Sequence, residues 1–270
     1  MKAISTEEAR KSIRQDLLER FSREFSFRLA VEENEREKVF SLRHEVFLKE
    51  LHYNMEEDSS HHLELDEYDD ASIHCLIKHK RTNLPAGCLR LVIPSKSKAD
   101  SHHLLPVEVH GGDSLDHKTF RPSHLPRERI CEVSRLAISR DFRGKTTSES
   151  TETATDNMML FKEKEKQTFP LIVIGLFLCT YALVGLTGRH HVFAMMEPRL
   201  PRLLALSGFH FTKVGKTIDF HGKRNAFYID HSKAEKEIHE ELIPLYLHIQ
   251  NELTPQLEAA MPRHELTAIL

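Results

Sequence analysis

A charged triplet interrupts a strand-like stretch in the middle of the chain. Residues 130–138 are mostly apolar and have the length of one strand, yet Glu132, Ser134 and Arg135 lie among them. A carboxylate and a guanidinium inside a core strand are costly unless they are paired or take part in chemistry. The stretch is therefore either an edge strand with a structural ion pair or a strand that carries an acid–base group.

Two further arginines have apolar surroundings. Arg43 lies among the apolar residues of a predicted helix, and Arg90 lies in a predicted strand. An acidic run, 64–70, follows the helix and contains Glu64, Asp66 and Asp69. Such a run is commonly a solvated loop, but it could also be a carboxylate cluster that binds these arginines, Arg135 or a cationic substrate amine.

The elements that must position these groups follow from apolar periodicity. The pattern predicts a helix over 1–23, a strand over 25–31, a helix over 34–51 capped by Asn34, strands over 72–79, 86–94 and 130–138, a helix over 171–186, a strand over 191–196, a helix over 198–206, a hairpin over 211–229, and a terminal helix over 232–260 broken at Pro244 and Pro255. Polar composition predicts a partly ordered excursion over 95–128 and a flexible insertion over 144–168. The result is an α/β sandwich around one mixed sheet, with a domain over 1–230 and a C-terminal helical extension over 231–270.

Composition limits the function classes. The formal charge of −3 argues against broad nucleic-acid binding. The four cysteines have no CxxC spacing, which indicates reduced, buried thiols and a reducing compartment, with a disulfide between strands as an alternative. The 19 histidines include no HExxH motif, so no metal site is expected, and no glycine-rich nucleotide motif is present.

Two segments bear on localisation. The N-terminus has no apolar signal region, which favours a cytoplasmic protein. Residues 171–186 are almost wholly apolar but shorter than the ~20 residues that a membrane-spanning helix needs. A buried helix is therefore expected there, with no membrane span, although peripheral membrane contact stays open and a membrane anchor is the alternative.

Four motifs in order resemble one enzyme family. They are Arg43-His44-Glu45-Val46-Phe47, the spacing Glu64-x-Asp66-x-x-Asp69, Gly87-Cys88-Leu89-Arg90-Leu91, and Glu132-Val133-Ser134-Arg135-Leu136-Ala137. The chain resembles the acyl-homoserine-lactone synthases and long-chain N-acyl amino acid synthases of the GNAT superfamily. It is most similar to the branch called PEP-CTERM/exosortase system-associated acyltransferases. The resemblance covers roughly residues 25–230 and implies a GNAT-like three-layer sandwich with a mostly antiparallel sheet and added terminal helices.

The resemblance implies roles for individual residues. Glu132 would take the proton from an attacking amine, assisted by Ser134 and Arg135, and a backbone N–H near Ala137 would hold the oxyanion. The substrate-binding positions would be Arg43, Phe47, Glu64, Asp66, Asp69, Arg90, Ala137 and Phe142. Alternation directs Cys131 to the face opposite Glu132, so it is not expected to be a nucleophile.

Two departures from the family bear on the substrates. The lactone synthases have a tryptophan where this chain has His52-Tyr53, and the chain has no tryptophan, which puts S-adenosylmethionine in doubt as co-substrate. The phosphate-cradling loop expected after residue 138 is replaced by Arg140-Asp141-Phe142-Arg143-Gly144-Lys145. This favours an acyl-carrier-protein thioester over a CoA thioester.

The expected activity is N-acylation of an amine such as an amino acid. The acyl group, expected to be long, would come from an acyl-phosphopantetheine thioester (acyl-ACP or acyl-CoA) as co-substrate, with no permanently bound cofactor. Arg189, Arg199, Arg202 and Lys213 would dock an acidic carrier protein. The alternative is a non-catalytic module on the same fold that binds an acyl ligand or regulates.

Overall fold

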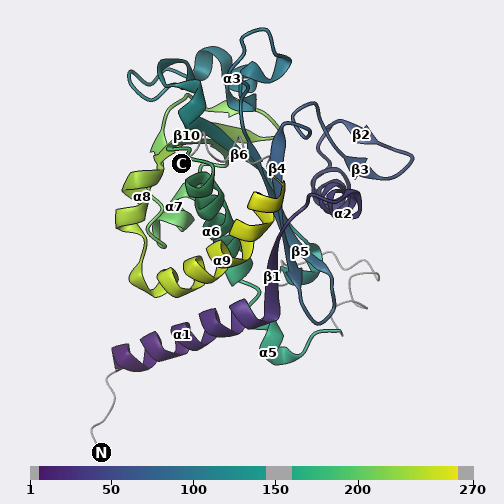
Figure 1. The fold of residues 1–270 in the computed structure, drawn as a ribbon, viewed down its shortest axis with the longest axis vertical. Helices are drawn as coiled ribbons and strands as arrows, with labels where there is room; N and C mark the ends of the chain where they lie inside the picture. Colours follow the sequence, from purple (N-terminus) through teal and green to yellow (C-terminus); the bar gives the residue numbers. More distant parts are fainter. Residues whose placement is uncertain (1–5, 144–159, 261–270) are drawn as a thin grey trace, which may run out of the picture.

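An eight-stranded mixed sheet organises the fold (Figure 1). The computed structural model describes residues 6–143 and 160–260. The strand order is β1-β4-β5-β6-β7-β10-β8, with β9 paired to β10, and the β6–β7 pair is parallel while the others are antiparallel. The strands are β1 Phe25–Leu29, β4 Ser72–His79, β5 Pro85–Val92, β6 Ile130–Ile138, β7 His191–Met196, β8 Thr212–Lys213, β9 Ile218–Asp219 and β10 Lys223–Asp230; a separate hairpin joins β2 Glu57–Asp58 to β3 Leu63–Glu64.

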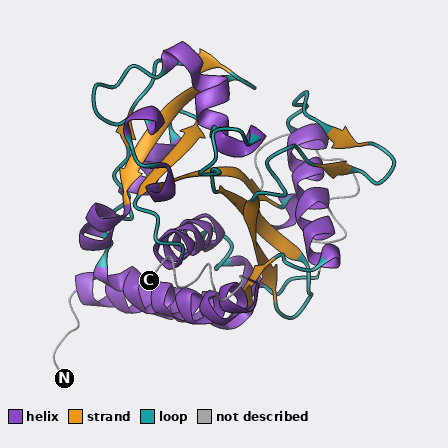
Figure 2. Ribbon diagram, turned by 45° about the horizontal axis from the view of Figure 1, so that its top comes forward, coloured by secondary structure: helices purple, strands orange, loops and turns teal. Residues whose placement is uncertain are grey.

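Helices cover both faces of the sheet (Figure 2). The α6 and α9 helices lie on one face, and α2 lies on the other. The helices are α1 Thr6–Glu24, α2 Glu33–Arg43, the π-helix η1 His44–Glu50, α3 Pro106–Gly111, α5 Glu163–Lys166, α6 Leu171–Leu186, α7 Leu200–Ala205, α8 His231–Glu237 and α9 Ile243–Ala260. Short 3-10 turns are η2 Ser101–His103, η3 Gly112–Ser114, η4 Pro122–His124, η5 Arg127–Arg129, η6 Arg140–Phe142 and η7 Glu240–Leu242.

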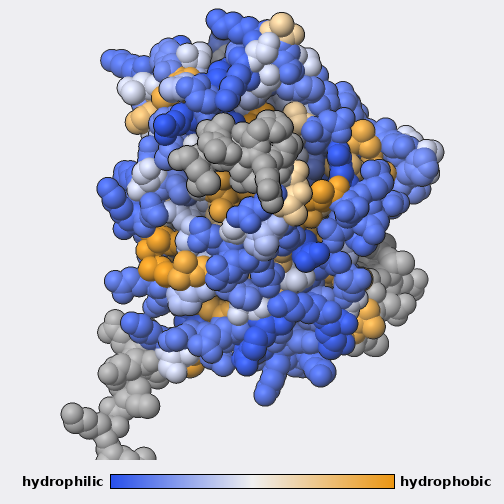
Figure 3. Space-filling model, viewed as in Figure 1, coloured by the Kyte–Doolittle hydropathy of each residue, from blue (hydrophilic) through white to orange (hydrophobic). Residues whose placement is uncertain are grey.

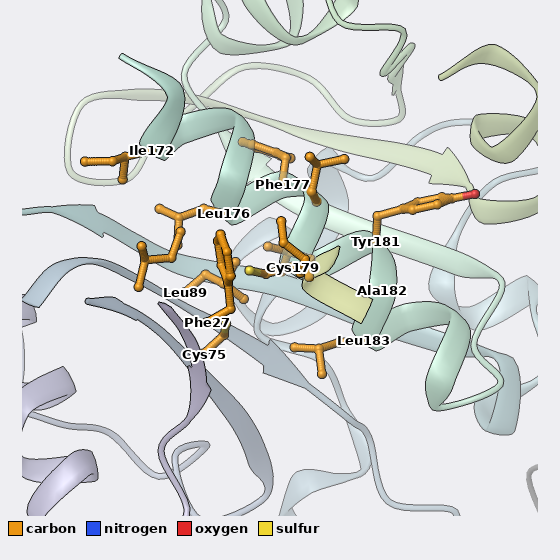
Figure 4. Close-up of a cluster of buried hydrophobic side chains, with 14 of the residues drawn as sticks. Phe27, Cys75, Leu89, Ile172, Leu176, Phe177, Cys179, Tyr181, Ala182 and Leu183 are labelled. Carbon is orange, nitrogen blue, oxygen red and sulfur yellow. The ribbon is translucent and has the colours of Figure 1, made fainter. Parts of the chain in front are cut away.

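The main core lies between the sheet and α6. Phe27, Cys75 and Leu89 point from the strands towards Leu176 and Cys179 of the helix (Figure 4). Helix α6 has apolar residues on all sides, and most of them are buried, as its sequence predicts. All four cysteines are free and buried, so the alternative of a disulfide between strands is wrong.

Within the described residues, no helix is both long and apolar enough to span a membrane.

Helix α9 packs along the edge strand β1 of the sheet. Its side chains bind the free edge of β1: Glu252 Oε2 accepts from the Phe27 N–H at 2.9 Å, and Gln256 Oε1 accepts from the Leu29 N–H at 3.0 Å. The apolar side of α9, including Leu253, belongs to the main core. The described residues of the predicted C-terminal extension therefore pack against the main core, and helix α9 covers an edge that would otherwise pair with other chains.

Two irregularities in β6 shape the centre of the sheet. The parallel pairing of β6 with β7 runs only to Val133 and Ala194, so the two strands part beyond that point. On the other side, Arg90 pairs with Ser134 whereas Cys88 pairs with Ala137, which places one extra residue in β6. This is a β-bulge, and Arg135 in it has φ 53°, a left-handed conformation that is strained outside glycine.

The sequence places most elements correctly, with local differences. Helix α2 has Glu32, not Asn34, as its N-cap, and the predicted helix over 34–51 changes to a π-helix at His44, which leaves Leu51 exposed. Pro244 lies in the first turn of α9, where proline is tolerated, and α9 continues through Pro255.

The described parts of two predicted irregular regions are more ordered than their composition indicates. The excursion over 95–128 forms helix α3, whose Val107 is buried. Residues 144–159 of the predicted insertion lie outside the described residues, but 160–168 pack on the domain through buried Phe161 and a Glu165–Arg81 ion pair of 2.7 Å. Buried anchors thus offset the polar composition of both regions.

Candidate active site

Arg43 is the centre of a buried ion network. Its Nε donates to Glu64 Oε2 at 2.5 Å, and its two terminal nitrogens donate to the Asp69 carboxylate at 2.7 and 3.0 Å. The Arg43 and Glu64 side chains are fully buried. The acidic run is therefore a carboxylate cluster that receives arginines, and the solvated-loop alternative holds only for its exposed members, such as Asp70.

Arg90 joins the same carboxylates to β6. Its Nη1 donates to Asp66 at 2.5 Å and to Asp69 at 2.8 Å, and its Nε donates to Ser134 Oγ at 3.0 Å. Burial by itself would raise the pKa of Asp69, but the hydrogen bonds and charge of Arg43, together with the charge of Arg90, lower it below its ordinary range. The network is thus held in its ionised form.

The β-bulge brings Arg135 into this network. Simple alternation would place Arg135 on the face opposite Ser134, but the extra residue in β6 directs both to the face of Arg90. Arg135 Nε donates to Glu64 at 3.0 Å and its Nη2 to Asp66 at 2.6 Å. Three guanidiniums and three carboxylates therefore balance in charge beside β6.

Glu132 lies on the same face but outside the ion network. It is 2% exposed, and its Oε2 accepts a hydrogen bond of 2.7 Å from the Val107 N–H at the start of α3. Burial raises the pKa of Glu132 to about 8, although the Val107 bond and the charge of Arg90 act in the opposite direction. A carboxyl with a pKa close to neutrality can exchange a proton with a substrate.

A cavity of about 360 Å³ lies where β6 and β7 part. Residues from both faces of the sheet line it, so it passes between the two strands. On the α6 side the lining is apolar and aromatic: Phe177, Tyr181, Val184, Phe209, Phe211 and Ile229. On the α3 side the lining is polar and aromatic: Phe47, Tyr53, His110, Glu132, Ser134, Arg135, His221 and Arg224.

Two histidines on the polar side are uncharged near neutral pH. His110 stacks on Phe220 with ring centroids 4.4 Å apart, and His221 stacks on Tyr53 at 5.0 Å. Burial, and then the charge of Arg135, lowers the pKa of both histidines. His110 lies in the predicted excursion over 95–128, and His221 lies at the turn of the predicted hairpin over 211–229. Neither histidine was selected from the sequence; the selected residues nearby were His52-Tyr53, of which Tyr53 stacks on His221.

Several residues expected at the site lie elsewhere. Phe142 packs in an aromatic cluster with Phe161 and Phe169, both 4.8 Å away by ring centroids, and does not line the cavity. Ala137 is buried beneath α2 and does not line the cavity either. Burial raises the pKa of Cys131 to about 12, and its side chain belongs to the core on the face opposite Glu132, as alternation predicts.

The four expected docking cations are not equivalent. Arg189 is 9% exposed and donates to the Arg127 and Ile130 carbonyls at 2.9 and 3.2 Å, so it holds the chain entering β6 rather than offering charge to a partner. Arg199, Arg202 and Lys213 are exposed.

Among the described residues, no three His, Cys, Asp or Glu side chains are grouped so that they could hold a metal ion.

Comparison with known proteins agrees with this architecture. Residues 42–151 match the family model described as acetyltransferase (GNAT) domain. FeeM, an N-acyl amino acid synthase from uncultured soil microbes, superposes with a TM-score of 0.52 at 12% identity, over 81% of this chain and 97% of FeeM. The chain has a GNAT-like fold.

Two further solved structures agree at the level of the fold. BjaI, a CoA-dependent acyl-homoserine lactone synthase solved with SAM and isopentyl-CoA, superposes with a TM-score of 0.51 at 19% identity, over 84% of this chain and 89% of BjaI. TofI, in a ternary complex with an inhibitor and MTA, gives 0.51 at 16% identity, over 78% of this chain and 96% of TofI. A search of curated proteins found no match.

Proposed function

We propose that the protein is an N-acyltransferase that moves an acyl group from a phosphopantetheine thioester to an amine. The observation that carries the proposal is the position of Glu132: a buried carboxyl with a pKa of about 8, in a cavity between two parting strands of a GNAT-like sheet. The apolar side of the cavity suits an acyl chain, and the polar side suits the acceptor amine.

The chemistry needs no covalent intermediate. The amine nitrogen bonds to the thioester carbon, the C–S bond breaks, and Glu132 accepts the amine proton and returns it to the leaving thiolate. Backbone N–H groups of the bulge at Arg135 and Leu136, which both face Leu89 and line the cavity, take over the oxyanion role expected near Ala137.

The finer assignments are part of the proposal. The motif resemblance supports the PEP-CTERM/exosortase-associated branch, a long acyl chain and a carrier-protein donor. Five residues of the ion network hold Ser134 and Arg135 in place: Arg43, Glu64, Asp66, Asp69 and Arg90. Phe47 lines the acceptor side of the cavity. The direct test is incubation with acyl-ACP and acyl-CoA thioesters and a panel of amines. Free-thiol release that depends on the amine, with an N-acyl product in the mass spectrum, supports the proposal; thiol release independent of any amine contradicts it.

Carrier-protein docking makes a separate prediction. Helix α7 presents exposed Arg199, Arg202, Leu203 and Leu206 outwards while Leu200 lines the cavity. Figure 3 shows apolar patches on an otherwise hydrophilic surface on the side of α7 and α8. Charge reversal by Arg202→Glu should raise KM for acyl-ACP about tenfold and leave KM for acyl-CoA unchanged, because only the acidic carrier meets this surface. Lys236→Glu, an exposed cation on α8, is the control, and equal effects on both donors would contradict docking here.

A further inference from the structure

The first turn of helix α3 supplies the backbone donor that Glu132 receives. Pro106, at the first helical position, has no N–H, so the first N–H inside the helix is that of Val107, which bonds to Glu132 Oε2 at 2.7 Å. Leu105 and Val107 are fully buried and belong to the same core cluster as Ile130 at the start of β6. Whatever holds this turn in place therefore also holds the donor to Glu132.

Glu108 fastens the turn from within α3. Its Oε2 accepts a hydrogen bond of 2.9 Å from the Leu105 N–H, which closes the turn on itself. Two parallel bonds from Arg127 reach the same carboxylate: Nη1 donates to Oε2 at 2.6 Å and Nη2 to Oε1 at 2.8 Å. The Arg127 and Glu108 side chains are 16% and 10% exposed, so solvent screens this bidentate pair only weakly.

Arg127 is itself anchored beside β6. It opens the turn η5, which runs directly into the strand, and its carbonyl accepts from Arg189 Nη1 at 2.9 Å. Two residues on, the Arg129 carbonyl accepts from the His190 N–H at 3.0 Å. The guanidinium therefore extends from a fixed backbone, and its pair with Glu108 ties the end of the excursion over 95–128 to α3.

Glu108 also acts on Glu132 through its charge. Burial raises the pKa of Glu132 most, and the charge of Glu108 raises it further. The charges of Arg90 and Arg135 act in the opposite direction. Arg127 balances the Glu108 carboxylate at hydrogen-bond distance. The other titratable groups around Glu132 and its cavity are the Tyr68 phenol, His110, His221 and Arg224.

We propose that Arg127 is a positioning residue for Glu132, although it does not line the cavity. Through its pair with Glu108 it fixes the first turn of α3, keeps the Val107 N–H on the Glu132 carboxyl and balances a like charge beside that carboxyl. The inference rests on the proposed N-acyltransferase function and adds to its site a residue that acts from outside the cavity.

The test is the pH dependence of the base. Arg127→Gln leaves the Glu108 charge unbalanced and loosens the turn, and both effects disfavour an ionised Glu132. The acid limb of kcat/KM should therefore move to higher pH, and kcat/KM at pH 7 should fall about three- to tenfold. Arg127→Lys keeps the charge and should recover most of that loss. Arg129→Gln removes an exposed cation two residues along and is the control that should match wild type.

A double variant separates this role from a merely structural one. Arg127→Gln combined with Glu108→Gln also loses the ion pair, but it leaves no like charge near Glu132, so its acid limb should return close to that of wild type. If Arg127→Gln lowers kcat/KM equally at all pH values and leaves the limb in place, the inference is overturned. A limb that moves to lower pH would overturn it as well, because hydration rather than the Glu108 charge would then control Glu132.

A measurement without turnover separates the inference from the proposed function. In protein labelled with ¹³C at the glutamate side-chain carboxyl, the NMR signal that titrates near pH 8 and is missing in Glu132→Gln belongs to Glu132. A midpoint moved to higher pH in Arg127→Gln, in a protein that transfers no acyl group, would keep the positioning role and remove the acyltransferase. Acyl transfer with an unchanged Glu132 midpoint in that variant would keep the acyltransferase and remove the role of Arg127.

Discussion

Replacing Glu132 with glutamine should lower kcat/KM for acyl transfer on the order of 10²–10⁴-fold, the contribution of a positioned general base. The change is nearly isosteric, and the amide oxygen can still accept the hydrogen bond from the Val107 N–H. Glu128 is an exposed carboxylate just before β6, and Glu128→Gln is the matched control that should leave kcat/KM unchanged. Turnover by the Glu132 variant close to that of wild type would rule out this base.

The pKa of Glu132 adds two pH signatures. Because the base must be ionised, kcat/KM of the wild type should rise with pH up to about 8, and the residual activity of the glutamine variant should lack this limb.

The free energy of unfolding should fall as pH rises, whereas kcat/KM should increase. The folded pKa of Glu132 is raised from 4.5 to about 8, so its contribution to stability is present below 4.5 and is lost as pH rises towards 8. Glutamine removes the cost of burying the charge, so the glutamine variant should have a higher Tm than wild type at pH 8 and a similar Tm at pH 5. A lower Tm at pH 8 would contradict the burial of an ionisable group.

Replacing Arg43 with methionine should have the largest effect on folding, about 3–5 kcal/mol of lost unfolding free energy, because it leaves three carboxylates of the buried network with only two guanidiniums, those of Arg90 and Arg135. Glu64 and Asp69 are 0% and 4% exposed and cannot recover this loss by hydration. Arg36→Met, two turns earlier on α2, removes a pair with Asp70, whose side chain is 91% exposed, and should cost less than about 1 kcal/mol. Urea unfolding of both variants measures the difference.

The loss of unfolding free energy in the Arg43→Met variant should depend on pH. Arg43 and Arg90 lower the pKa of Asp69, so this group contributes stability above its ordinary pKa of 3.8 and loses it as pH falls below that value. The gap in stability between wild type and the Arg43 variant should therefore narrow in acid. A gap that stays constant down to acid pH, or equal costs for Arg36→Met and Arg43→Met, would show that the network does not hold the fold.

Local patterns in the sequence were enough to place most elements and to select the charged groups. Strands β4, β6 and β7 and helix α6 have the predicted bounds because their apolar runs are long and end at turn residues. The cost of placing Arg43 and Arg90 in apolar segments predicted that carboxylates would meet them, and the acidic run over 64–70 supplies those carboxylates.

Only the tertiary structure decided how these groups share one site. The apolar periodicity of the sequence does not reveal the extra residue in β6. That bulge places Arg135 on the same face as Ser134, where it joins the ion network through Asp66. Burial against α3 sets the pKa of Glu132, and α3 lies in a polar excursion whose docking depends on contacts far along the chain.

Phe142 and Arg224 show the same limit in opposite ways. Phe142 was expected to bind substrate but packs against Phe161 and Phe169 away from the cavity, and Arg224 had no sequence signal yet lines the cavity. Pairing between distant segments fixes which face a residue joins, and that information is not local in the sequence. The sequence by itself determined which groups are too costly to bury unpaired; the fold determined which partner, face and cavity each one received.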